Sequence, residues 1–112
     1  MESAEYNRDA ESRRKILEYI DKSMELFGEN AKTAIYWRME NEFGLKREEI
    51  PSKPEAFARF LEVMFGHGSK IVVRITIQKM KQLSGIKNLP SDNLAKAIRE
   101  IERFDPQNNT VK

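Results

Sequence analysis

The 112-residue chain has no cysteine, a single histidine and no long uncharged hydrophobic run. Without cysteine it cannot form disulfides, use a thiolate in catalysis or bind zinc through sulfur. No segment approaches the roughly 20 apolar residues of a membrane helix. The opening residues Met-Glu-Ser-Ala-Glu also lack the apolar stretch of a signal peptide. We therefore expect a cytoplasmic protein that makes no membrane contact.

The composition is that of a globular domain. Hydrophobic residues make up 39% of the chain and charged residues 34%, a balance that allows one packed core. We predict a single helical domain over residues 1–104. Within it, residues 1–12 are expected to overhang as the start of a long first helix, and residues 105–112 form a flexible tail.

Glycine marks the ends of four helix-length segments. Three of them stop at a Phe-Gly pair and the fourth at Ser84-Gly85, and glycine just past a helix accepts the left-handed conformation that ends it. This pattern predicts an all-α, bundle-like arrangement of about five helices. The expected helices are Ser3–Phe27, Ala31–Phe43 with Asn30 as its N-cap, Pro54–Phe65 preceded by Lys53, Lys70–Leu83 capped by Ser69, and a last helix from the N-cap Ser91 to Phe104.

The segment Lys70–Leu83 fits two interpretations. Ile71, Val73, Ile75 and Ile77 alternate as in a strand, and β-branched residues favour strands. No second strand candidate offers backbone partners, however, and a helix would place its polar residues on one narrow stripe. We predict a helix that is apolar nearly all round and therefore central in the fold.

Positive charge is concentrated in one part of the chain. Residues 1–62 have a net charge of −3, whereas residues 63–91 carry five basic side chains and no acidic one. Such asymmetry is typical of proteins with polyanionic partners. The candidate contacts for an anion or nucleic acid are Lys70, Arg74, Lys79 and Lys81. Burial of the same helix would argue against this function.

Few residues suggest chemistry. His67 lies in Phe-Gly-His-Gly-Ser-Lys, where Ser69 and Lys70 could hold a phosphate or carboxylate at a helix start, but a solvent-exposed His67 between two helices is the simpler expectation. No carboxylate interrupts an apolar stripe, as a general acid or base would. We predict no catalytic residue, cofactor or metal, and no enzyme activity.

Two neighbouring aromatic residues could contact a partner. Tyr36 and Trp37 lie off the apolar stripe of their helix, and such residues are enriched where protein surfaces bind each other. A single tryptophan is more often part of a core, and a core or partly buried position is the expectation for Trp37.

Part of the chain resembles a small archaeal family. The stretch GENAKTAIYWRMENEFGLKREEIPSKPEAF, followed by FGHGSK and an apolar-basic helix, is similar to proteins named after Nitrosopumilus output domains. The resemblance covers Arg14–Gly85 and depends mainly on Asn30–Trp37 and the Glu49-Ile50-Pro51 turn. It implies a compact helical module, sometimes attached to signalling or regulatory domains as their effector end, and it implies no catalytic or ligand residues.

These observations lead to two functional hypotheses. The first is a non-enzymatic interaction module that self-associates as a homodimer or binds a protein partner, because its fourth helix has more apolar surface than so small a domain easily covers. The alternative is a small nucleic-acid-binding regulator, with a role in transcription, that uses the basic stripe of the same helix.

Overall fold

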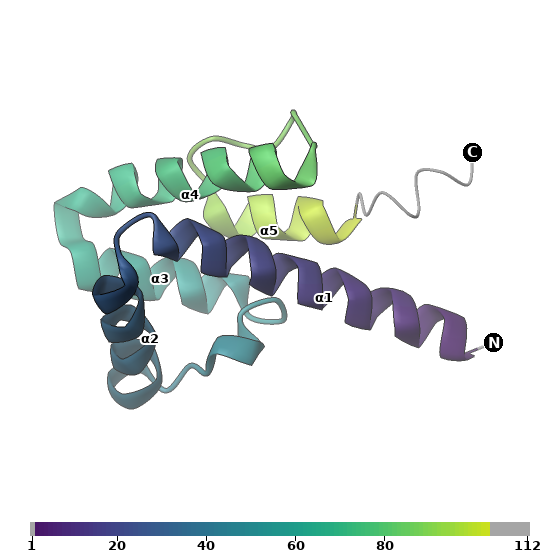
Figure 1. Cartoon of the computed structure of the whole chain (residues 1–112), viewed down its shortest axis with the longest axis horizontal. Coiled ribbons are helices and arrows are strands. Elements are labelled where there is room, and N and C mark those ends of the chain that lie inside the picture. The colour runs from purple at the N-terminus through teal and green to yellow at the C-terminus, as the bar shows by residue number, and fades with distance from the viewer. Residues whose placement is uncertain (1, 104–112) are drawn as a thin grey trace.

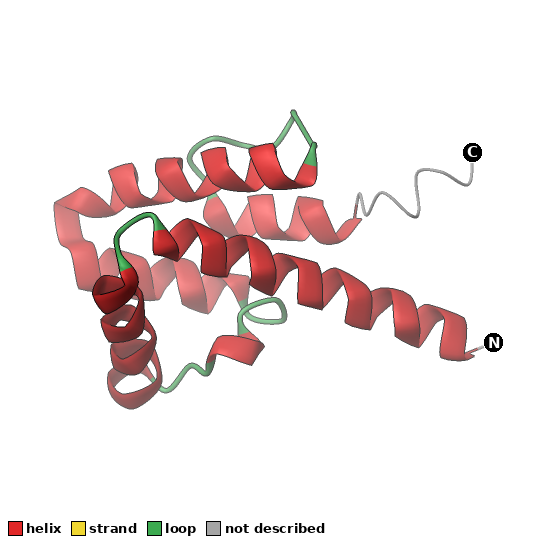
Figure 2. Cartoon of the chain, in the orientation of Figure 1, coloured by secondary structure: helices red, strands yellow, loops and turns green. Residues whose placement is uncertain are grey.

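The chain folds into α-helices, and no strand occurs among residues 2–103 (Figure 2). This computed structural model describes residues 2–103, with side chains from residue 10 onward. Its elements are α1 (Glu2–Glu25), α2 (Glu29–Phe43), the 3₁₀ turn η1 (Arg47–Glu49), α3 (Pro54–Phe65), the 3₁₀ turn η2 (Gly66–Gly68), α4 (Ser69–Ser84) and α5 (Leu94–Arg103). The all-α prediction is confirmed. The predicted tail, residues 105–112, lies outside the described residues.

Helix α1 organises the packing. It contacts α2, α4 and α5, while α3 packs against both α4 and α5. In Figure 1, α2 stands across one end of the other helices, and the beginning of α1 extends past its neighbours at the opposite end. A 24-residue helix is about 36 Å long, which nearly matches the 42 Å longest extent of the molecule.

The core is one cluster to which every α-helix contributes an apolar stripe. Side chains three and four residues apart lie on one side of a helix, which is why the spacing in the sequence identifies most of these positions. The predicted inner residues that the structure buries include Ile20, Met24, Ile35, Met39, Phe57, Leu61, Leu94 and Ile98. Burial of these stripes is the main source of stability for helices of this length.

The segment Lys70–Leu83 is helical, as predicted. The prediction that this helix is central in the fold is wrong. Helix α4 buries Val72, Thr76, Ile77 and Met80, whereas Ile71 is 61% exposed and Lys70 and Arg74 are also exposed. One side of α4 packs against α1, α3 and α5, and the opposite side is exposed at Ile71, Gln78 and Gln82. Helix α4 is therefore a surface helix, with its basic residues accessible.

Helices α1 and α4 approach closely at two small residues. Ser23 and Thr76 are both fully buried, and the Ser23 hydroxyl lies 3.5 Å from the Thr76 carbonyl oxygen. Each hydroxyl donates to the carbonyl one turn earlier in its own helix, Ser23 to Tyr19 and Thr76 to Val72, both at 2.8 Å. These internal bonds satisfy the hydroxyls, so polar side chains can occupy the crossing without a desolvation penalty.

Two helices end at a glycine that adopts the left-handed backbone conformation. Gly44 (φ 74°) ends α2 and Gly85 (φ 78°) ends α4, and the Gly85 N–H donates to the Lys81 carbonyl at 2.9 Å. The first helix is shorter than predicted, since α1 ends at Glu25 instead of Phe27. Helix α3 opens at Pro54 after Lys53, as expected.

The predicted N-caps of three helices are wrong. Helix α2 begins at Glu29, one residue before Asn30, and α4 continues directly from η2, so Ser69 is its first residue and caps nothing. Helix α5 begins at Leu94, where the Asn93 side chain accepts from the Lys96 N–H at 3.0 Å, a role that we predicted for Ser91. Before α5, the neighbouring Ser91, Asp92 and Asn93 are all suitable caps, and spacing alone does not choose between them.

Candidate functional site

Three of the four predicted basic residues share one side of α4. Lys70, Arg74 and Lys81 are four and seven residues apart, which brings them close to one line along the helix. Lys79 lies about half a turn from Lys70 and belongs to a different side. Lys70 and Arg74 are exposed, whereas Lys79 and Lys81 are half-buried.

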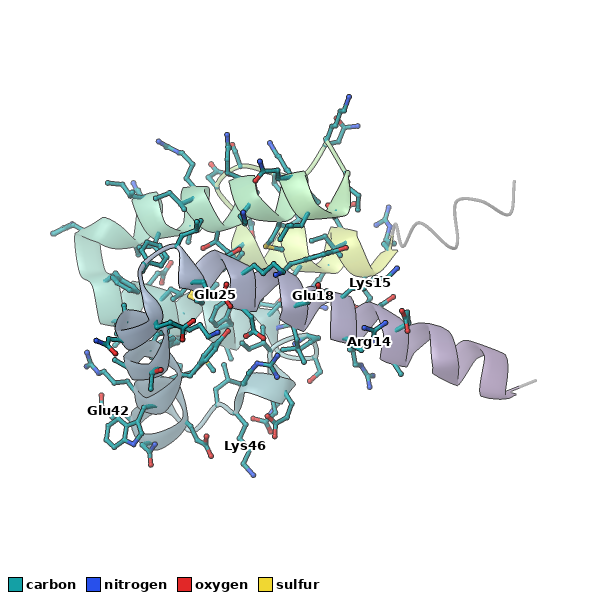
Figure 3. The ribbon with its side chains drawn as sticks, in the orientation of Figure 1. Arg14, Lys15, Glu18, Glu25, Glu42 and Lys46 are labelled. Atoms are coloured by element: carbon teal, nitrogen blue, oxygen red, sulfur yellow. The ribbon has the colours of Figure 1, made fainter. Side chains whose placement is uncertain are left out.

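Lys87, in the loop after α4, lies near Lys81 at the end of this helix. It lines a surface hollow of about 340 Å³ together with Gln78, Lys81 and Gln82. We define the α4 basic face as Lys70, Arg74, Lys81 and Lys87. Nitrogen-tipped side chains project from the outer side of α4 in Figure 3. Sequence reasoning counted Lys87 in the charge bias but did not place it in the site, because its position depends on the turn at Gly85.

The cations of the α4 basic face have no acidic partner among the described residues. Elsewhere in the described chain, ion pairs join Arg14–Glu11, Lys32–Glu25, Arg38–Glu42, Arg47–Asp21, Lys53–Glu49 and Arg99–Glu55. No carboxylate of the described residues pairs with Lys70, Arg74, Lys81 or Lys87. The positive charge of this face is therefore not compensated locally, and its field extends into solvent.

A second hollow, of about 470 Å³, lies at the beginning of α4, between α3 and the segment entering α5. Its polar lining residues are Glu62, Ser69, Lys70, Arg74, Asp92 and Asn93. The two hollows thus lie at opposite ends of the α4 basic face. His67, in η2 just before this helix, is exposed, as predicted.

Tyr36 belongs to a polar cluster that joins α1, α2 and η1. Its hydroxyl donates to Asp21 Oδ1 at 2.6 Å, and Arg47 donates from Nε to Oδ1 at 3.0 Å and from Nη2 to Oδ2 at 2.5 Å. Burial acts to raise the pKa of Asp21, but these bonds and the Arg47 charge outweigh it and hold that pKa below its ordinary value. Burial and the bond to Asp21 raise the pKa of Tyr36. The cluster fixes α2 and η1 to α1 and keeps the Tyr36 hydroxyl occupied.

Replacing Asp21 with asparagine tests the contribution of this cluster. We expect the free energy of unfolding to fall by about 1 kcal/mol at pH 7. Because the folded-state pKa of Asp21 lies below its ordinary 3.8, the stabilisation is present above about pH 4 and is lost as the pH falls through the folded-state value. Urea unfolding at pH 7 and at several values below pH 4 measures the difference between Asp21→Asn and the wild-type chain.

The difference in free energy of unfolding between Asp21→Asn and the wild-type chain should shrink towards zero in acid. Glu42→Gln is a matched control, because it removes a carboxylate whose pair with Arg38 is solvent-exposed, and it should change stability little at pH 7. An Asp21→Asn penalty that is equally large at pH 2 and pH 7 would contradict the role assigned to the ion pair.

Trp37 is on the surface, and the expectation of a core position is wrong. Its side chain is 58% exposed on α2, while the neighbouring Tyr36 is half-buried. Trp37 and Tyr36 therefore do not form one exposed aromatic pair. Trp37 remains a candidate partner contact, together with the adjacent exposed Arg38.

Residues 10–103 contain no group of three or more His, Cys, Asp or Glu side chains placed to hold a metal ion. Among the helices described, none is long and apolar enough to cross a membrane. Comparison of the chain with protein families, with curated proteins and with solved structures finds no match. The resemblance to the archaeal output-domain family therefore stays a prediction.

Proposed function

We propose that the chain is a non-enzymatic helical binding module that attaches to nucleic acid through the α4 basic face, as a cytoplasmic regulator or the effector part of a regulatory system. One observation carries this proposal. Lys70, Arg74 and Lys81 lie on one side of the surface helix α4, Lys87 lies in the loop after it, and none of the four has a described acidic partner. A surface lysine or arginine often forms an ion pair with a nearby carboxylate. None of the four cations of this face does so within the described residues.

The spacing of these cations suits a phosphate backbone. At 1.5 Å per residue, Lys70 and Arg74 are about 6 Å apart along the helix axis, and Arg74 and Lys81 about 10 Å apart. Nucleic acid presents negative charge at regular intervals of a few ångströms, and each lysine or arginine that neutralises a phosphate releases a counterion. Contacts of this kind bind without reading bases, so we expect little sequence preference.

The test is binding of a fluorescently labelled DNA duplex, followed by anisotropy at several salt concentrations. Four phosphate contacts predict that the logarithm of the binding constant falls with the logarithm of salt concentration with a slope of about −3 to −4. Lys81→Gln should reduce the slope by about one. The combined change of Lys70, Arg74 and Lys81 to glutamine should weaken binding at least about tenfold at low salt.

Arg38→Gln is the matched control, since it removes an exposed cation that pairs with Glu42 on α2. It should leave both affinity and salt slope unchanged. The proposed interface would be ruled out if the chain did not bind DNA at low salt. It would also be ruled out if Arg38→Gln lost as much affinity for DNA as the α4 variants.

A second candidate function is self-association as a homodimer. Ile71 on α4 and Val63 on α3 are 61% and 64% exposed, so two helices that pack against each other both present apolar surface to solvent. Ile71 lies about a quarter turn from the α4 basic face, so a contact between copies through Ile71 would leave the cations free.

Light scattering after gel filtration tests this second function. We expect a mass twice the 13.1 kDa of the chain at high protein concentration, and a shift to the single-chain mass in Ile71→Glu, because a charge at the contact would be desolvated. Leu26→Glu is a suitable control, since Leu26 is also exposed but lies after the end of α1. A single-chain mass across all concentrations would refute self-association.

A further inference from the structure

The hollow at the beginning of α4 has the features of a small-ligand site. Its volume of about 470 Å³ lies in the range of ligand pockets in proteins. It is bounded by α3, by the first turns of α4 and by the segment that enters α5, so three parts of the chain distant in sequence form its walls. Both α4 and α5 begin at residues that line it, which adds the positive ends of two helix dipoles.

Ser69 provides an independent sign of a ligand. This residue is only 7% exposed, it lines the hollow, and none of the described residues hydrogen-bonds to its side chain. No fully buried side-chain oxygen or nitrogen in the described chain lacks a partner. The unpartnered Ser69 hydroxyl therefore keeps its small accessible area, and the hollow is the space into which it can donate or accept.

Charges of both signs line the hollow without neutralising one another. Lys70 and Arg74 stand on α4, Glu62 stands on α3, and Asp92 precedes α5. None of these four side chains makes an ion pair with another described residue. A ligand that satisfied all of them would need an anionic group towards Lys70 and Arg74 and hydrogen-bond donors towards the two carboxylates.

We propose that this hollow binds a small phosphate monoester that carries hydroxyl groups, such as a sugar phosphate. The phosphate accepts hydrogen bonds from Ser69, Lys70 and Arg74, and the hydroxyls donate to Glu62 and Asp92. This site shares Lys70 and Arg74 with the proposed nucleic-acid contact, whereas Ser69, Glu62 and Asp92 take no part in that contact. Lys81 and Lys87, in turn, take no part in the hollow.

The experiment is a titration of the ¹⁵N-labelled full chain with ribose 5-phosphate and, separately, with inorganic phosphate, followed by NMR. We expect saturable shifts of the Ser69, Lys70 and Arg74 amides with both probes, and tighter binding of ribose 5-phosphate. Ser69→Ala should lower the affinity of the chain for both probes about tenfold, which is the usual effect of losing a hydrogen bond to a charged group. Arg38→Gln, on α2 and outside the lining of the hollow, should bind both probes as the wild-type chain does.

The carboxylates separate this specific site from a generally positive surface. In Glu62→Gln with Asp92→Asn, inorganic phosphate should bind about threefold more tightly because repulsion is removed, while the preference for ribose 5-phosphate is lost. Ser69 amide shifts that do not saturate, or equal affinities of Ser69→Ala and the wild-type chain, would overturn the proposal. These outcomes do not depend on DNA binding, which Lys81→Gln reports separately.

Discussion

Replacing Phe57 with alanine is expected to lower the free energy of unfolding by about 3–5 kcal/mol. Phe57 is fully buried in α3, within the cluster where this helix meets α4 and α5. Removing its ring loses the transfer energy of the side chain and leaves a cavity that the surrounding helices cannot fill. Because a domain of this kind is stable by only about 5–15 kcal/mol, the loss is a large part of the total.

Urea unfolding followed by circular dichroism measures this effect. Val63→Ala is the matched control on the same helix, since Val63 is exposed and its truncation should change stability by no more than about 0.5 kcal/mol. A Phe57→Ala loss below about 1 kcal/mol would mean that α3 does not present this side chain to the core.

Replacing Ser23 with aspartate should destabilise the fold by about 3–5 kcal/mol at neutral pH. Ser23 is fully buried where α1 crosses α4, and the Thr76 carbonyl oxygen lies 3.5 Å from its hydroxyl. A carboxylate there would be desolvated beside the carbonyl oxygens of Tyr19 and Thr76. Ser23→Ala provides the comparison, since it keeps the close approach of the helices and should cost about 1 kcal/mol or less.

The Ser23→Asp penalty should also depend on pH. Burial would raise the pKa of the introduced carboxyl above its unfolded value, so the penalty is complete at neutral pH and becomes smaller as the pH falls towards about 4, the pKa of an aspartate in the unfolded chain. Urea unfolding at pH 7 and pH 4 tests this expectation. A penalty equal at both values would indicate that crowding, and not charge, is responsible.

The core was predictable because burial follows the helical repeat. Ile20, Met24, Ile35 and Met39 were identified from spacing alone, since a side chain that faces its neighbours recurs every three to four residues. The same logic failed for α4. Its apolar residues extend almost round the helix, and composition cannot say which side lacks a neighbour, so the exposure of Ile71 depends on how α1, α3 and α5 are placed.

The candidate site was predictable in its charge but only in part in its geometry. The absence of acidic residues from 63–91 pointed to the α4 basic face, and the helical repeat aligns Lys70, Arg74 and Lys81. The bond between Asp21 and Arg47 joins residues 26 positions apart, which no local pattern reveals. The hollow beside Ser69 is also a product of tertiary packing, because Glu62 and Asp92 come from other elements.

The packing of α1 has a consequence for synthesis on the ribosome. Helix α1, with its buried residues Ile16, Ile20 and Met24, packs largely against α4 and α5, which are translated later. At about 5–20 residues per second, the interval between the end of α1 and the start of α5 is roughly 3 to 14 s. During that time the nascent first helix presents an apolar stripe without its cover, and chaperones that recognise such stripes would meet this chain through α1.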